Sequence, residues 1–451
     1  MEPDLDLLVI GGGMGGLTAA ANAARNGLSV IVIEIGADVG GSGRYAGYIW
    51  TAPTREVMEE QNPGGDRELR ELIVDNFAEA VAWIDSSGVR TGQAQRILPF
   101  GVGHRFDTNR YVDTCRKIVE EAGGEVWLRA TPSDLLEADG AVVGARVTTS
   151  DGRSSELRAR YTLIATGGFQ GSTHLREELV GPGAGNLPVR SNPHSCGGGM
   201  DLARAVGAAT GFERAGFYGH LVPSGIPFAD PSDFVDLSLY FSEHALLFNL
   251  DGERFSDETL GDHLTTIALS EQPEARGLLV ADSRVHRTWS ATPYVEGAEV
   301  IDKFALATRR GGRTGVAGTL AELDLLPEEW GYDGPKIRQA VDHFNARAGA
   351  SQVLTPGRRL DAAPLDEPPF YVIEAIPAIT FPFCGIKVDS RARVVDATGA
   401  VIPGLLAAGS DTGGLWNRAY AGGVASAVVF GLIASATART HGVRSAPTTH
   451  S

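Results

Sequence analysis

The start of the chain constrains the fold more than any other stretch. Residues 7–10 form a short, continuous apolar run, which is the pattern of a strand buried on both faces. The run ends in a glycine turn over residues 11–16 that fits G-x-G-x-x-G, and small helix-compatible residues follow. A second apolar run, residues 29–33, ends on Glu34. The order strand, glycine turn, helix, strand and acid predicts a dinucleotide-binding unit.

Each feature of this unit has a physical role in binding. Glycines let the backbone approach a pyrophosphate, the helix N-terminus offers free N–H groups, and an acid can hold a ribose hydroxyl. A bare glycine match would be weak in a chain with 58 glycines, where an ordinary tight turn is the alternative. The flanking strands, and an acid eighteen positions after the last glycine, favour the dinucleotide site. The expected contacts are Gly11, Gly13, Gly15, Gly16 and Glu34.

Three further glycine-rich segments follow along the chain. Residues 40–47 form a second glycine loop, residues 161–168 form an apolar strand that runs into small residues, and residues 402–411 repeat that design. Gly422 and Gly423 then open a helix expected over residues 424–436. These segments suit one long, extended cofactor. The expected contacts are Gly40, Gly41, Ser42, Gly47, Ala165, Thr166, Gly167, Gly409, Ser410, Gly423 and Val424.

In this order the four motifs resemble those of the FAD-dependent fumarate reductase and succinate dehydrogenase flavoprotein superfamily, which includes 3-ketosteroid and tricarballylate dehydrogenases. The resemblance runs from Leu5 to about Ala436. It implies an α/β fold, in which a Rossmann-like FAD-binding domain (a parallel sheet with helices and a small β-layer) carries an inserted α+β capping domain. We therefore expect a first FAD segment at 1–217, a capping and substrate domain at 218–376, a second FAD segment at 377–436 and a frayed tail at 437–451.

The resemblance also bears on how the cofactor is held. Succinate dehydrogenases tether FAD through a histidine in the second glycine loop, and residues 40–47 contain none. Non-covalent FAD is therefore expected.

Composition narrows the class of protein. The net charge of −17 argues against nucleic-acid partners and anionic membrane surfaces, whose phosphates favour clustered Lys and Arg. The three cysteines form no CxxC and no metal-ligand spacing, so we expect no metal and a reducing, cytoplasmic location. No basic segment precedes the first apolar run, and residues 424–436 are too few to span a bilayer. We therefore expect neither a signal peptide nor a membrane span.

When this sequence is aligned with the motifs of the fumarate reductases, the substrate-binding residues of those enzymes are not retained. In those enzymes two histidines and an arginine hold the substrate carboxylates, and an arginine in the cap delivers the proton. Here Thr380 stands at one substrate histidine and Tyr420 at the clamping arginine. Asp262, followed by His263, stands at the proton-transfer position, and His220 alone matches a substrate histidine.

The replacements resemble the ketosteroid dehydrogenase pattern more closely. There a tyrosine before the last helix donates to the substrate ketone, and a base acts from the cap. Dehydrogenation next to a carbonyl needs a hydride acceptor, a base and a donor to the carbonyl oxygen. Tyr420 is the expected donor, and Asp262 or His263 the expected base, with Asp262 able instead to orient His263. A slip of one or two residues in the alignment would make Tyr240 or Tyr218 the base.

The predicted function is that of an FAD-dependent oxidoreductase acting on a CH–CH bond adjacent to a carbonyl, by hydride transfer to flavin N5 and proton transfer to a cap base. The reaction is either α,β-dehydrogenation or the reverse enone reduction, and the expected substrate is a cyclic or bulky ketone. Expected substrate contacts are Thr380, Phe381 and Arg418. The other partner is an unidentified electron acceptor or donor. The alternatives are a tricarballylate-dehydrogenase-like enzyme acting on a carboxylate and a non-catalytic flavin redox sensor.

Overall fold

The computed structural model describes residues 4–98, 100–227, 233–293 and 299–440. The chain divides into two compact units. The first unit comprises Met1–Gly181, Asn192–Gly216 and Phe381–Ser451, and the second comprises Pro182–Ser191 and Phe217–Thr380. The second unit thus includes residues 182–191, residue 217 and residues 377–380, which the sequence prediction assigned to the FAD-binding segments. Residues 441–451 of the expected tail lie outside the described residues.

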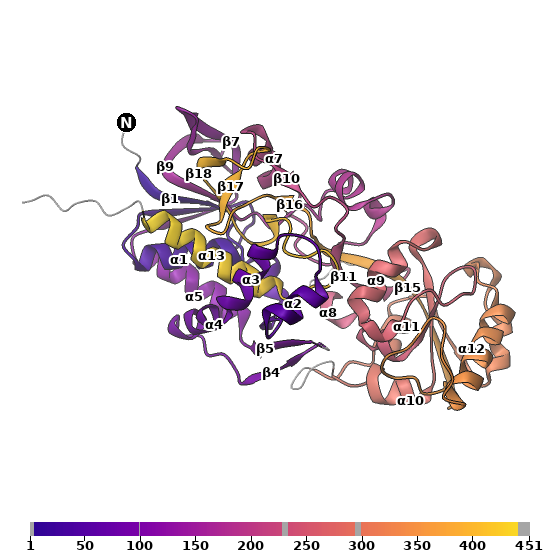
Figure 1. Ribbon diagram of the computed structural model, residues 1–451. Coiled ribbons are helices and arrows are strands. Elements are labelled where there is room, and N and C mark those ends of the chain that lie inside the picture. Colours follow the sequence, from indigo (N-terminus) through magenta and orange to yellow (C-terminus); the bar gives the residue numbers. More distant parts are fainter. Residues whose placement is uncertain (1–3, 99, 228–232, 294–298, 441–451) are drawn as a thin grey trace, which may run out of the picture. The chain divides into compact units, whose positions relative to one another are not determined.

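A largely parallel sheet organises the first unit, and it confirms the predicted α/β fold (Figure 1). Its order is β17-β18-β9-β1-β2-β6, in which β1 pairs in parallel with both β2 and β9. The central residues of β1 are fully buried, as a strand covered on both faces must be. The bounds are β1 (Leu5–Ile10), β2 (Val30–Glu34), β6 (Glu125–Leu128), β9 (Ser154–Ile164), β17 (Arg393–Val395) and β18 (Val401–Ala407).

Helix α1 (Met14–Arg25) follows the glycine turn and packs against α13 (Gly423–Thr440) and α5 (Thr108–Glu121) (Figure 1). The two helices α1 and α13 approach closely, since a Cβ at Gly431 would lie 2.6 Å from the Gly15 carbonyl oxygen. Helix α13 is longer than predicted. It is apolar and long enough to cross a membrane, but 61% of it is buried inside the protein, as in the core helix of a globular unit.

Smaller elements complete the first unit. Residues 66–86 have apolar residues at helical spacing throughout, but they form two helices that meet at Asn76, whose side-chain amide donates to the Leu72 carbonyl (2.8 Å). The β-layer consists of β7 and β8 with β9, and β3, β5 and β4 form a separate antiparallel sheet. The bounds are α2 (Arg55–Gln61), α3 (Arg67–Asp75), α4 (Phe77–Ser86), α6 (Thr173–Leu175), α7 (Gly198–Ala205), β3 (Tyr48–Thr51), β4 (Ala94–Ile97), β5 (Gly101–Arg105), β7 (Ala130–Ala138), β8 (Ala141–Thr149), β10 (Thr210–Gly211) and β16 (Gly385–Ile386).

The second unit is a sheet with helices, as the expected inserted α+β domain requires. Its order is β11-β15-β13-β12, and β14 also pairs with β15. Residues Leu320–Leu325 form a 3-10 helix. The bounds are β11 (Phe217–Pro223), β12 (Leu246–Phe248), β13 (Gly277–Ala281), β14 (Thr314–Ala317), β15 (Phe370–Pro382), α8 (Asp233–Asp236), α9 (Asp262–Ser270), α10 (Ser283–Val285), α11 (Lys303–Arg309) and α12 (Gly334–Gly349).

Candidate active site

The glycines of the first turn serve two purposes: some are needed for the turn to pack, and one leaves space beside the turn. A Cβ at Gly11, where φ is +107°, would lie 2.2 Å from the Ala165 carbonyl oxygen, and a Cβ at Gly16 would lie 2.0 Å from the Gly11 oxygen. Both positions are therefore required by the packing of the turn itself. A Cβ at Gly13 would meet only the Ala165 oxygen, at 3.9 Å. The protein leaves room at Gly13, beside the N-terminus of α1, and this cradle fits a pyrophosphate.

Glu34 lies against this turn at the end of β2. Its buried carboxylate accepts the N–H of Gly12 (2.8 Å) and the N–H of Gly36 (2.7 Å). A carboxylate has about four lone-pair sites, so two backbone bonds leave capacity for a ribose hydroxyl. The position of Glu34 therefore fits the role that the sequence predicts for it.

The second glycine loop lies beside the first. The Gly40 N–H donates to the Gly12 carbonyl (2.7 Å), and Gly13 and Gly40 form a parallel bridge. Gly41 begins the 3-10 helix Gly41–Tyr45, in which the Ser42 hydroxyl accepts the N–H of Asn192 (3.0 Å). A Cβ at Gly47 would meet nothing within 4 Å. The structure thus brings Gly40, Gly41 and Ser42 to the pyrophosphate cradle.

The third and fourth motifs meet at the carboxyl ends of β9 and β18, where open α/β sheets bind ligands. A residue that the sequence reasoning missed, Asp411, joins them. Its carboxylate accepts the Thr166 hydroxyl (2.9 Å) and the N–H groups of Gly167 (2.9 Å) and Gly168 (3.2 Å). Burial raises the pKa of Asp411. Its only sequence signal is an acid directly after Gly409-Ser410. The predicted contacts Ala165, Thr166, Gly167, Gly409 and Ser410 lie in these two joined loops.

Tyr420 lies just before α13, and its phenol oxygen accepts the N–H of Gly423 at 2.7 Å. Its buried ring makes edge-on contacts with Trp50, Phe381 and Trp416, at centroid distances of 5.2, 5.9 and 6.3 Å. The structure therefore brings two predicted site residues, Tyr420 and Phe381, together in an aromatic cluster. Two further predicted contacts differ in exposure, since Arg418 is exposed and Val424 is half-buried at the start of α13.

A chain of hydrogen bonds in the second unit links Asp262, His220 and Tyr218. The Asp262 carboxylate, at the start of α9, is hydrogen-bonded to His220 Nδ1 and accepts the Leu221 N–H (3.1 Å) and the Ser242 hydroxyl (3.3 Å). His220 Nε2 lies 2.7 Å from the Tyr218 hydroxyl. Tyr218 and His220 are two residues apart on β11, so their side chains leave the same face of the strand.

Burial shifts the pKa values of the two ionisable groups in this hydrogen-bonded series, His220 and Asp262. Desolvation lowers the pKa of His220 well below its ordinary value and raises the pKa of Asp262 to about 7. The partner that Asp262 orients is His220, whereas the sequence reasoning considered His263 for that place. The ring of His263 is buried and lies 5.6 Å from the ring of Tyr218. Tyr218 is half-buried, whereas Asp262 and His220 are buried, so Tyr218 is the most exposed of these three hydrogen-bonded residues.

Thr380 and Tyr240 share a partner that the sequence reasoning missed, Arg190. Its guanidinium donates to the hydroxyls of Ser238 (3.0 Å), Thr380 (2.9 Å) and Tyr240 (3.3 Å). Arg190 belongs to the segment 182–191, which the structure assigns to the second unit. No periodicity or motif marks it, so only the tertiary structure identifies it.

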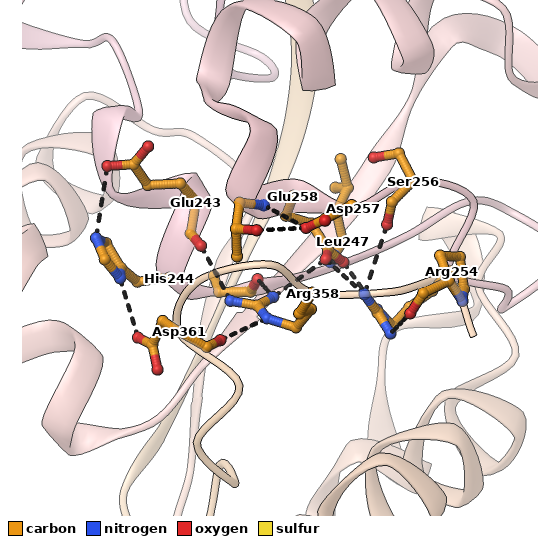
Figure 2. A network of polar contacts seen from close by, with 12 residues as sticks. Glu243, His244, Leu247, Arg254, Ser256, Asp257, Glu258, Arg358 and Asp361 are labelled. Atoms are coloured by element: carbon orange, nitrogen blue, oxygen red, sulfur yellow. Dashed lines mark hydrogen bonds and ion pairs between the residues drawn. The ribbon is translucent and has the colours of Figure 1, made fainter. Parts of the chain in front are cut away.

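Arg254 and Glu258 brace the second unit (Figure 2). The buried Glu258 carboxylate pairs with Arg254 (2.6 Å) and Arg358 (3.1 Å) and accepts the Leu247 N–H (3.0 Å). Arg358 also donates to the backbone carbonyls of Glu243 (3.0 Å) and Ala245 (2.8 Å). Glu258 lies four residues before Asp262, which begins α9.

Comparisons with known proteins agree with this geometry. The family described as FAD binding domain matches residues 6–426. The probable fumarate reductase Ifc3 of Shewanella frigidimarina is 24% identical over 96% of this chain and 75% of its own length. The 4-oxocyclohexanecarboxylate 2-dehydrogenase of Sinomonas cyclohexanicum is 24% identical over 92% of this chain and 89% of its own length. Among solved structures, the 3-ketosteroid delta1-dehydrogenase of Sterolibacterium denitrificans has the same fold, with a TM-score of 0.77 and 18% identity over 97% of this chain and 99% of its own.

The match over most of the chain shows the family, and the Gly13 cradle, Glu34 and the joined glycine loops fit its cofactor. The chain therefore belongs to the FAD binding domain family, and it is an FAD-dependent flavoprotein oxidoreductase of the reductase and dehydrogenase type.

Proposed function

We propose that this protein dehydrogenates a carbon–carbon bond next to the carbonyl group of a cyclic or bulky ketone, or reduces the corresponding enone. The observation that carries the proposal is Tyr420, a phenol held at the start of α13 among aromatic rings. In the fumarate reductases that the sequence resembles, this position carries an arginine that clamps the substrate carboxylate. A phenol suits a neutral carbonyl oxygen better than it suits a carboxylate, and the aromatic neighbours favour an apolar ring.

In this proposal, Tyr420 has the role of hydrogen-bond donor to the substrate. Because the Gly423 N–H can only donate, the phenol oxygen is the acceptor in their bond, and this bond does not engage the phenol proton. A ketone oxygen gains negative charge when the neighbouring α-proton leaves, and a fixed donor stabilises that charge. The positive end of the α13 dipole acts in the same direction.

The second unit supplies the proton-transfer group. The Asp262 carboxylate holds His220 Nδ1–H, which leaves Nε2 to accept the proton of the Tyr218 hydroxyl. Tyr218 is then the group that takes the substrate α-proton, and Asp262 orients His220 instead of contacting substrate. His263, beside the Tyr218 ring, is the second candidate for this role. FAD, when bound, supplies the hydride acceptor at flavin N5.

A carboxylate-bearing substrate is the second candidate. The observation that favours it is the Arg190 guanidinium at the Thr380 hydroxyl, a cation in the unit that carries the proton-transfer chain. One relative's name, 4-oxocyclohexanecarboxylate 2-dehydrogenase, combines a ring ketone with a carboxylate in one substrate. A substrate of that kind would combine the chemistry of the two candidates.

The test is anaerobic bleaching of the flavin by a panel of compounds. Saturated 3-ketosteroids and 4-oxocyclohexanecarboxylate should bleach it, while millimolar succinate should not, and fumarate should not reoxidise the reduced protein. Tyr420→Phe should lower the bleaching rate by about 10²-fold, the typical effect of one oxyanion donor. The matched control is Tyr332→Phe, which alters a buried tyrosine outside the site.

The panel also separates the alternatives. Rapid fumarate reduction, or a Tyr420→Phe variant as fast as the wild type, would overturn the proposed function. Bleaching by simple carboxylates alone would favour the second candidate. A protein that no compound bleaches, and that changes its oligomeric state when dithionite reduces it, would be a redox sensor.

A further inference from the structure

A distant side chain shapes the loop that presents Tyr420. Asn62 follows α2, and it is fully buried, with 0% of its surface exposed. Its side-chain oxygen accepts three successive backbone N–H groups of that loop, those of Asn417 (3.1 Å), Arg418 (3.2 Å) and Ala419 (3.1 Å). The last of these residues directly precedes Tyr420.

Three successive N–H groups that converge on one atom form a concave nest with a defined backbone conformation. Such a nest needs an acceptor, since a buried N–H without one is costly. The chemistry of the contacts therefore assigns the Asn62 oxygen, and not its nitrogen, to the loop. The Asn62 nitrogen faces the sulfur of Met58, at 3.9 Å.

Reciprocal bonds join the two segments. The Gly64 N–H donates to the Asn417 side-chain oxygen (2.9 Å), and the Asp66 N–H donates to the Gly414 carbonyl (2.9 Å). A Cβ at Gly65 would lie 2.6 Å from the Gly414 oxygen, so the backbones are in direct contact. Residues 62–66 thus serve as a template for residues 414–419, which lie about 350 positions further along the chain.

We infer that Asn62 is a positioning residue for the catalytic phenol: its side-chain oxygen holds the Tyr420 hydroxyl in place by ordering the three residues before it. The inference rests on the proposed role of Tyr420 as carbonyl donor. Asn62 itself contacts neither the phenol nor the Gly423 N–H. A displacement of about 1 Å in such a group can lower a rate about 10²-fold, so the position of the loop has a direct catalytic consequence.

The experiment compares Asn62→Ala, Asn62→Asp and the control Asn345→Ala in the FAD-bound protein. Asn345 also binds backbone groups, the N–H (2.8 Å) and carbonyl (2.7 Å) of Leu365, but in the second unit. Hydrogen exchange at the amides of residues 417–419 should speed up in Asn62→Ala. It should stay slow in the control and in Asn62→Asp, which retains an acceptor. This measurement needs no substrate.

Turnover of the panel ketone that bleaches the flavin fastest provides the second readout. Asn62→Ala should lower kcat by about 10²-fold, the effect of a misplaced group, with the flavin content unchanged. Asn62→Asp should restore turnover. In a Tyr420→Phe background, Asn62→Ala should have almost no additional effect, because the hydroxyl that Asn62 positions is already gone.

Each other outcome overturns a defined part of the argument. Unchanged exchange in Asn62→Ala, or rate losses that multiply with those of Tyr420→Phe, would overturn the inference about Asn62. A Tyr420→Phe variant with full activity would instead overturn the proposed function. Should Asn62→Ala fail to fold, Asn62→Ser takes its place, since its shorter side chain cannot reach all three N–H groups.

Discussion

The two units of this protein prepare their chemistry by different means. The first uses backbone: glycines that admit a pyrophosphate, N–H groups at the start of α1 and α13, and carboxylates that accept from backbone N–H groups. The second uses buried charge, with the Glu258 brace (Figure 2) and the hydrogen-bonded series Asp262–His220–Tyr218. A backbone site suits a constant cofactor, whereas a side-chain site can change with the substrate.

The difference has a physical origin. Backbone N–H groups carry fixed partial charges that need no ionisation, so burying them does not depend on pH. Buried carboxylates and guanidinium groups lose hydration and are stable only when they are paired and hydrogen-bonded. The first unit should therefore respond to changes in shape, and the second to changes in charge. The following predictions test that distinction, from the largest expected effect to the smallest.

The first prediction concerns Gly13. Gly13→Val should abolish FAD binding in a protein that still folds, because the side chain would enter the cradle, where a Cβ meets the Ala165 oxygen at an ordinary 3.9 Å. The wild type should be yellow and should release all its flavin as FAD on acid precipitation, while the variant should be colourless with normal circular dichroism. Gly349→Ala, at a glycine with open space around it in α12, is the control. A yellow Gly13→Val protein would contradict the cradle.

The second prediction concerns the proton-transfer chain. Tyr218→Phe, His220→Ala and Asp262→Asn should each slow flavin reduction by substrate about 10²- to 10⁴-fold, the usual contribution of general acid–base catalysis. FAD content should not change, since the predicted FAD contacts all lie in the first unit. Anaerobic stopped-flow absorbance measures the rate. Full activity in all three variants, with a large loss in His263→Ala, would transfer the role to His263.

The third prediction concerns the brace. Glu258→Gln should leave two buried guanidinium groups without their shared carboxylate and should destabilise the protein by about 3–5 kcal/mol. Chemical denaturation followed by circular dichroism measures the loss. Lys336→Met, which removes an exposed pair with Glu253, should change stability by less than about 1 kcal/mol. Equal losses in the two variants would remove the contrast between buried and exposed charge.

The fourth prediction concerns pH. His220 can take a proton only while Asp262 is ionised to stabilise it, and burial raises the pKa of Asp262 to about 7. The rate of flavin reduction should therefore rise about tenfold per pH unit below pH 7 and level off above it. Asp262→Asn should lose this limb of the profile and retain a low, flat rate. A wild-type rate that is independent of pH between 5 and 8 would argue that Asp262 keeps one charge state.

Where the signal is local, the sequence predicted the structure closely. The strand–turn–helix–strand unit lies at β1, α1 and β2, because periodicity and glycine placement act over neighbouring residues. The prediction failed where a single side chain overrides a helical pattern, as Asn76 does between α3 and α4. It also stopped short of the end of α13, whose last turn carries Thr437 and Arg439 where the apolar pattern fades.

The candidate site divides in the same way. The sequence by itself predicted the four glycine loops as FAD contacts, the place of Tyr420 and the register of Asp262, since each rests on a motif of consecutive residues. Only the tertiary structure decided that Asp262 binds His220, 42 positions away, that Arg190 joins Thr380, and that Asn62 orders the loop before Tyr420. Strand, turn and helix signals act between neighbours in sequence, whereas distant groups, such as Asn62 and the loop that it orders, meet only when packing brings their elements together.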